Sequence, residues 1–203
     1  MKINAVIWDL GGVLVRTLDR SHRVAWEQEL KLDAGELDRL VFEGEIGRAA
    51  AIGKARADDI WAFIRERFGL SAEETQRIEQ DFWAGDQVDQ ELIALIRRLR
   101  SNYKTALLSN AWPDLRHALE ELWQIADAFD DIFISAEIGL AKPDERIYKL
   151  ALERLGVKPQ EAVFIDDFKR IIDAAADVGL HTIHYQNSAE TQAALKDLLG
   201  GER

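Results

Sequence analysis

The 203-residue sequence predicts an α/β fold in which a parallel sheet carries an inserted helical cap. From about residue 88 onward, short apolar runs alternate with helical patterns, as in parallel strands joined by right-handed crossovers. An earlier apolar run at 5–8 belongs to the same sheet, and residues 19–85 have helical patterning throughout. We therefore predict that residues 1–15 and 86–203 form the core and that residues 16–85 form the cap.

The predicted core alternates strand and helix. Its strands are expected at residues 5–8, 105–108, 132–134, 162–165 and 181–185. Its helices are expected at 88–99, around 113–125, at 144–155 and, as the last one, near 170–178. Gly156 and Gly179 follow two of these helices, which is the usual place of a helix-ending glycine. The elements thus follow one another as β-α-β units.

Residues from about 19 to 85 show no convincing strand. Ile60, Phe63, Ile64 and Phe68 recur at helical spacing and predict one amphipathic helix. The segment 71–74 (Ser-Ala-Glu-Glu) has the spacing of a capping box, so it should begin another helix.

Composition narrows the class of protein. The chain is 47% apolar and 31% charged, as in ordinary globular proteins, and it contains no cysteine, which excludes disulfides and thiolate sites. Its formal net charge of −11 disfavours nucleic acid and anionic membranes as partners. Because neither a membrane span nor a signal peptide is apparent, we expect a cytoplasmic protein, a monomer or a homodimer.

Polar side chains stand at the ends of several predicted strands. They are Asp9, Ser109 with Asn110, and Asp166 with Asp167. Because the carboxyl ends of parallel strands share one edge of a sheet, these groups should converge there. Lys142, in a loop after another strand, can reach the same edge. Carboxylates beside an ammonium predict a magnesium site with a positive clamp for an anion.

The order of these segments resembles that of the haloacid dehalogenase-like hydrolase superfamily, over nearly the whole chain. The similar segments are residues 6–14, 107–110, 142–144 and 164–167. The resemblance implies a Rossmann-like core with a small helical cap. It also implies a phosphatase of small phosphorylated metabolites that works through an aspartyl-phosphate.

The resemblance further implies roles for individual residues. Asp9 would be the nucleophile, and Ser109 would hydrogen-bond a phosphoryl oxygen. Lys142 would neutralise the charge on both Asp9 and the phosphoryl group. Magnesium would be held by Asp9, the Gly11 carbonyl and Asp167, with Asp166 as a further ligand or as a partner of the ligands. The expected substrate contacts are Asn110, Gly11 and, as a wall beside Asn110, Trp112.

The first motif departs from the family pattern at Gly11, where most family phosphatases carry a second aspartate that protonates the leaving group. Its absence should matter least for weakly basic leaving groups, as in anomeric sugar, aryl or acyl phosphates. Sugar phosphates are favoured, because branches with this Asp-Leu-Gly-Gly form include hexose 1-phosphate phosphatases. Glu45 of the cap could act as the acid or base instead, but its place favours a simple charge at a helix end.

The fourth motif departs at Ile171, where the family often has asparagine. Lys169 or Arg170 could restrain a carboxylate instead, but solvated charges on a helix are the favoured interpretation of both. Two rival functions stay open at this point. A metal-independent haloacid dehalogenase would also lack the second aspartate, but it would not keep the acidic pair Asp166–Asp167. A non-catalytic module would bind phosphate ligands without hydrolysing them.

Overall fold

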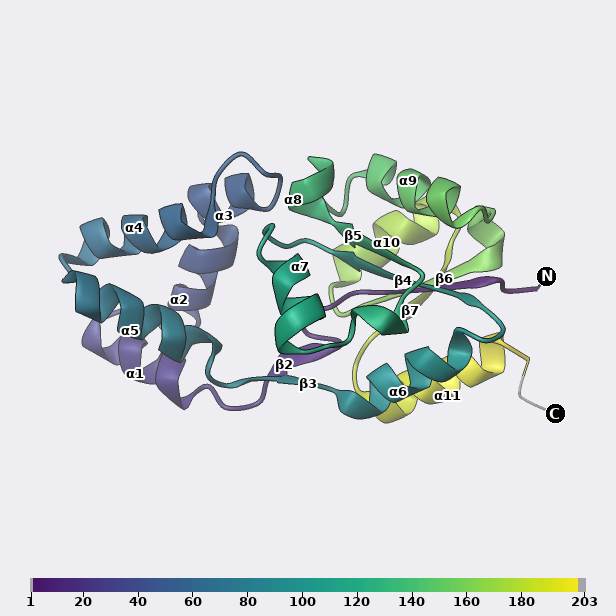
Figure 1. Cartoon of the computed structure of the whole chain (residues 1–203), viewed down its shortest axis with the longest axis horizontal. Coiled ribbons are helices and arrows are strands. Elements are labelled where there is room, and N and C mark those ends of the chain that lie inside the picture. The colour runs from purple at the N-terminus through teal and green to yellow at the C-terminus, as the bar shows by residue number, and fades with distance from the viewer. Residues whose placement is uncertain (1, 201–203) are drawn as a thin grey trace.

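The centre of the fold is a five-stranded sheet with the order β5-β4-β1-β6-β7, in which every neighbouring pair is parallel (Figure 1). The structure is a computed structural model that describes residues 2–200. Its strands are β1 (Ala5–Trp8), β4 (Lys104–Ser109), β5 (Asp131–Ile134), β6 (Ala162–Asp166) and β7 (His181–His184). The predicted α/β class and parallel sheet are confirmed.

Helices cover both faces of this sheet, which explains why its strands are apolar throughout. Successive residues of β1 point to opposite sides: Val6 packs on the side of α6 (Gln90–Leu99) and α11 (Ser188–Leu198). Ile7 packs on the side of α9 (Glu145–Leu155) and α10 (Lys169–Val178). Within residues 2–200, no helix has both the length and the apolar character needed to cross a membrane.

Three of the predicted helices differ from the observed ones. The helix expected to be the last is followed by α11, which Asn187 caps by accepting a hydrogen bond from the Glu190 amide at 2.9 Å. Asp89 likewise caps α6, so Val88 lies in a strand and not on that helix. The expected helix 113–125 is divided into the segments α7 (Leu115–His117) and η2 (Ala118–Leu122), a π-helical turn. The remaining short core elements are η3 (Ala126–Ala128), α8 (Ser135–Ile138) and η4 (Pro159–Glu161).

The inserted segment is helical, as predicted, and forms its own apolar cluster. Its elements are α1 (Ser21–Glu29), α2 (Glu36–Asp38), η1 (Arg39–Glu43), α3 (Glu45–Ala50), α4 (Ala57–Phe68) and α5 (Ala72–Trp83). Ser71 caps α5 with the predicted capping box. An antiparallel ribbon of β2 (Val15–Thr17) and β3 (Asp86–Val88) joins it to the sheet (Figure 1). The division at 15/16 and 85/86 stays a prediction.

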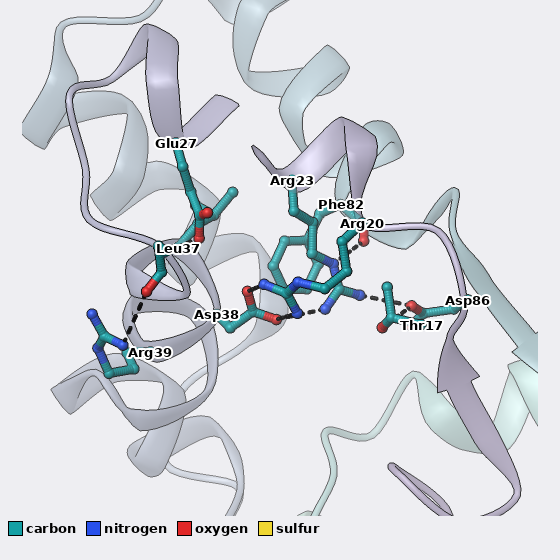
Figure 2. Close-up of polar contacts among 10 residues, drawn as sticks. Thr17, Arg20, Arg23, Glu27, Leu37, Asp38, Arg39, Phe82 and Asp86 are labelled. Carbon is teal, nitrogen blue, oxygen red and sulfur yellow. Dashed lines mark hydrogen bonds and ion pairs between the residues drawn. The ribbon is translucent and has the colours of Figure 1, made fainter. Parts of the chain in front are cut away.

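A buried arginine ties the cap to this ribbon (Figure 2). Arg23 of α1 is 3% exposed and donates to the carbonyl of Phe82 at 2.7 Å and to the carboxylates of Asp38 at 2.6 Å and Asp86 at 2.7 Å. Its guanidinium also lies 4.0 Å from the centre of the Phe82 ring. Asp86 belongs to β3 and accepts a hydrogen bond from Thr17 of β2. Both strands of the ribbon are therefore linked to α1.

Replacing Arg23 by methionine is expected to lower the free energy of unfolding by about 2 kcal/mol, since the partly buried carboxylate of Asp86 loses its arginine partner and the Phe82 carbonyl loses its donor. Asp38 keeps its pair with Arg20. Arg56→Met is the matched control, because the Arg56–Asp58 pair is 81% and 78% exposed and such pairs contribute less than about 1 kcal/mol. Urea denaturation of both variants measures the difference. Equal losses would show that Arg23 has no special structural role.

Candidate active site

The carboxyl edge of the central strands brings together the polar side chains that the sequence singles out. Asp9 follows β1 directly, and its amide donates to the Ile165 carbonyl of β6 at 2.9 Å. Ser109 ends β4, the neighbour of β1 on the other side, and Asp166 ends β6. The exposed fractions of Asp9, Ser109 and Asp166 are 6%, 4% and 0%. The predicted convergence therefore produces a buried polar site.

Lys142 lies in the middle of this site. Its Nζ is 2.7 Å from Oδ1 of Asp9 and 2.6 Å from Oδ2 of Asp166, and the residue is 3% exposed. Burial disfavours the charge on Lys142, but attraction to the two carboxylates outweighs it and raises the pKa of the ammonium group. A fixed positive charge thus stands beside Asp9.

Asn110 holds the backbone of Lys142. Its Nδ2 donates to the Lys142 carbonyl and its Oδ1 accepts from the Lys142 amide, both at 2.8 Å. Both ends of the amide side chain are used in this way, so Asn110 positions the lysine. The predicted contact of Asn110 with a substrate stays a prediction.

Three carboxylates form the acidic side of the site. Asp9, Asp166 and Asp167 each offer an oxygen, and these oxygens lie within 4.8 Å of one another. Asp166 is fixed, because its second oxygen accepts from the Phe168 amide at 2.8 Å. Oδ1 of Asp167, by contrast, is buried and has no hydrogen-bond partner in the described part of the chain.

Crowding of these carboxylates shifts their titration. Burial, with the nearby charge of Asp166 as a further cause, raises the pKa of Asp9 to about 7, although Lys142 opposes the shift. Burial and the same neighbour raise the pKa of Asp167 to about 6. Three carboxylates this close together, with the Asp167 oxygen unpartnered in the described part of the chain, fit a hard divalent cation such as magnesium.

The two glycines after Asp9 have different surroundings. Gly12 has φ +78°, and a Cβ there would lie 2.2 Å from Oδ2 of Asp167, so this position requires glycine. At Gly11, a Cβ would meet no described atom of the chain within 4 Å. The missing second aspartate is thus not excluded by lack of space.

Three other residues singled out in the sequence make no hydrogen bond or ion pair with the acidic side of the site among the described residues. Lys169 pairs with Asp173 on its own helix, so the idea that it restrains a carboxylate of the acidic pair is wrong. Ile171 is buried in the apolar cluster between α10 and the sheet. Glu45 is exposed at the first residue of α3.

One polar contact at this edge is absent from the sequence-based prediction. Nε2 of His184 lies 2.9 Å from the Asp167 carbonyl. His184 ends β7, directly opposite Asp166 in the strand register. The position of His184 at the end of the strand next to β6 could have predicted that it lies near Asp167.

The metal-free protein is expected to lose stability as the pH rises from about 4 to about 7, because Asp9 and Asp167 hold their protons more tightly in the folded state than in the unfolded state. Asp167→Asn should remove part of this dependence, about 1–2 kcal/mol, with partial exposure reducing the effect. Urea denaturation in EDTA at pH 5 and pH 8 measures it. An unchanged pH dependence in the variant would contradict the assignment.

A model of the haloacid dehalogenase-like hydrolases matches residues 3–179. The chain belongs to the haloacid dehalogenase-like hydrolase family. This match extends from the first strand to the glycine that ends α10, so it includes every segment of the acidic site described above.

Similar proteins have different stated activities. The chain is 28% identical to pig bifunctional epoxide hydrolase 2, with 98% of the chain matched, but it spans only 38% of the pig protein. It is 26% identical to the sesquiterpene phosphatase astK of Aspergillus oryzae, covering 97% of the chain and 96% of that protein. It is also 26% identical to a D-ribitol-5-phosphate phosphatase of Bacteroides thetaiotaomicron, covering 97% and 98%.

Solved structures share the fold at low identity. A haloacid dehalogenase family enzyme of Bacteroides thetaiotaomicron, in a magnesium complex, has a TM-score of 0.78 at 23% identity and covers 97% of this chain and 100% of its own. The L-2-haloacid dehalogenase of Xanthobacter autotrophicus has a TM-score of 0.65 at 23% identity, covering 98% and 83%. These likenesses establish the Rossmann-like fold. Because a dehalogenase shares that fold, the choice of chemistry depends on the site residues.

Proposed function

We propose that the protein is a magnesium-dependent phosphatase of small phosphorylated metabolites, acting through an aspartyl-phosphate on Asp9. The main support is the arrangement of Asp9, Asp167 and Lys142. Asp9 forms an ion pair with Lys142, and beside it lies the buried oxygen of Asp167, which has no partner among the described residues. Two relatives named as phosphatases match nearly the whole chain. The haloacid dehalogenase family enzyme of Bacteroides thetaiotaomicron that shares this fold has been solved with magnesium and inorganic phosphate.

Each residue then has a defined task. Asp9, Asp167 and the Gly11 carbonyl would hold magnesium, whose charge reduces the repulsion between a carboxylate and a phosphate dianion. Asp9 attacks phosphorus, and Lys142 offsets the negative charge of the attacking carboxylate and the phosphoryl group. Ser109 donates a hydrogen bond to a phosphoryl oxygen.

The remaining steps follow from the same residues. The bond from phosphorus to the leaving oxygen breaks, and that oxygen takes its proton from solvent, because Gly11 has no side chain to supply one. Water then cleaves the aspartyl-phosphate and returns Asp9. The proposed cap, residues 16–85, would cover the site during this chemistry and limit access of bulk water.

The acidic pair favours this proposal over a haloacid dehalogenase, which needs no metal. Asp166 pairs with Lys142, but Asp167 would place a further negative charge beside the nucleophile, with an oxygen that has no partner among the described residues, if no cation were bound. Within the phosphatases, the open position at Gly11 favours substrates whose leaving group is weakly basic. Among these, the sequence favours sugar phosphates that are bonded through the anomeric oxygen.

The test is phosphate release from p-nitrophenyl phosphate and from a hexose 1-phosphate, with magnesium and with EDTA. We expect release only with magnesium. Magnesium and phosphate binding without release would instead support a binding module. Halide release from 2-chloropropionate in EDTA would support the dehalogenase.

A further inference from the structure

Aromatic rings gather where the cap meets the catalytic edge. Trp112, in the loop after β4, stacks on Phe42 of η1 with ring centroids 5.9 Å apart and an interplanar angle of 26°. Trp83, at the end of α5, meets both rings edge-on, at 5.9 Å each. Phe82 contacts Phe42 and Trp83 from the cap interior. We call Phe42, Trp83 and Trp112 the aromatic wall.

The aromatic wall is unusually open for such large apolar side chains. Phe42 is 43% exposed and Trp83 is 38% exposed, while Trp112 is half-buried. Rings that served only to pack the cap would be covered, as Phe82 and Trp61 are in the same cluster. Exposed aromatic surface that is grouped, and not scattered, marks a place where a ligand or partner binds.

The wall is also fixed to the proposed phosphate site. Trp112 lies on the same loop as Asn110, whose amide holds the Lys142 backbone at 2.8 Å. On the cap side, Arg23 binds the carbonyl of Phe82 and covers its ring, so the layer behind the wall is held in place (Figure 2). A phosphate ester bound at Lys142 would therefore lie beside the loop that carries Trp112.

Resting on the proposed function, we propose that the preferred substrates are aryl phosphate monoesters, whose ring packs against the aromatic wall. A pair between the substrate ring and a ring of the aromatic wall would favour binding by about twofold to tenfold beyond simple burial. A sugar needs partners for its several hydroxyls, whereas phenyl rings offer none and an indole offers a single N–H donor. The wall therefore selects the aryl members of the class over hexose 1-phosphates.

The open position at Gly11 supports the same class independently. In the first step the Asp9 oxygen bonds to phosphorus and the bond from phosphorus to the aryl oxygen breaks, with its electron pair leaving on a phenolate. A phenolate is stable enough to leave without a proton from the enzyme, and it takes one from water afterwards. Water then attacks the aspartyl-phosphate, releasing inorganic phosphate and free Asp9.

The experiment compares phenyl phosphate, acetyl phosphate and a hexose 1-phosphate on the full chain with magnesium. Acetyl phosphate has a good leaving group but no ring, so it separates ring recognition from leaving-group basicity. We expect the wild type to prefer phenyl phosphate over the hexose 1-phosphate. Phe42→Ala should lower the ratio of kcat/KM for phenyl phosphate to that for acetyl phosphate by about tenfold, mainly through KM.

Leu198→Ala is the matched control, since Leu198 is a comparably exposed apolar residue on α11 and should leave the ratio unchanged. Equal losses of both substrates in Phe42→Ala, or a wild-type preference for the hexose 1-phosphate, would overturn the inference while leaving the phosphatase intact. Absence of magnesium-dependent release from all the substrates would overturn the proposed function itself.

Discussion

Asp9→Asn is expected to abolish magnesium-dependent phosphate release, with kcat at least about 10⁴-fold below wild type. An amide cannot form the acyl-phosphate bond, and the variant also removes the charge that Lys142 contacts at 2.7 Å. The same substitution removes a buried carboxylate whose pKa is raised to about 7, so the metal-free variant should unfold at no lower urea concentration than wild type at pH 8. The initial rate of phosphate release and the unfolding curve are the two measurements.

Asp173→Asn is the control for Asp9→Asn. Asp173 is an exposed carboxylate that pairs with Lys169 on α10, so this variant should keep wild-type turnover. If Asp9→Asn were folded and still released phosphate at a sizeable fraction of the wild-type rate, Asp9 could not be the nucleophile. If it lost activity only because it unfolded, the denaturation curve would show this.

Gly12→Ala is expected to lower kcat/KM by about 100-fold, an effect typical of disturbing the groups that support metal ligands. The added Cβ would lie 2.2 Å from Oδ2 of Asp167, and alanine is strained at φ +78°. Asp167 must then move, and its place beside Asp9 is lost. Magnesium titration followed by calorimetry should show weaker binding in the same variant.

Gly69→Ala separates the two causes of this loss. Gly69 ends α4 with φ +66°, close to the value at Gly12, but a Cβ there meets no described atom within 4 Å. This variant should therefore carry the backbone strain alone and keep its activity. Equal activity losses in the two variants would show that contact with Asp167 is not the reason that position 12 needs glycine.

The features that depend on periodicity were predictable from the sequence. Apolar runs ending in Asp9, Ser109 and Asp166 were sufficient to predict a parallel sheet with these groups at one edge, since strands of one direction must end together. The helix α11 was missed, although Asn187 followed by Glu190 at cap spacing was a signal of its start.

Contacts made by loops and by single polar side chains were not predictable in this way. The amide of Asn110 meets the Lys142 backbone across 32 residues of sequence, through two loops whose paths no periodic pattern specifies. Arg23 stands in a helical pattern where a charged residue is ordinarily solvated, yet its partners Phe82 and Asp86 are 59 and 63 residues away. Three-dimensional packing determines such contacts.

In the proposed reaction, Asp9 forms a covalent bond to the phosphoryl group. The most direct test of this bond is acid quenching of the enzyme during turnover of phenyl phosphate with magnesium, followed by mass spectrometry of the peptide that contains Asp9. We expect an added mass of one phosphoryl group on Asp9, absent in EDTA and in Asp9→Asn. Rapid quenching during active turnover that found the phosphoryl group on another residue, or on none, would contradict this role of Asp9.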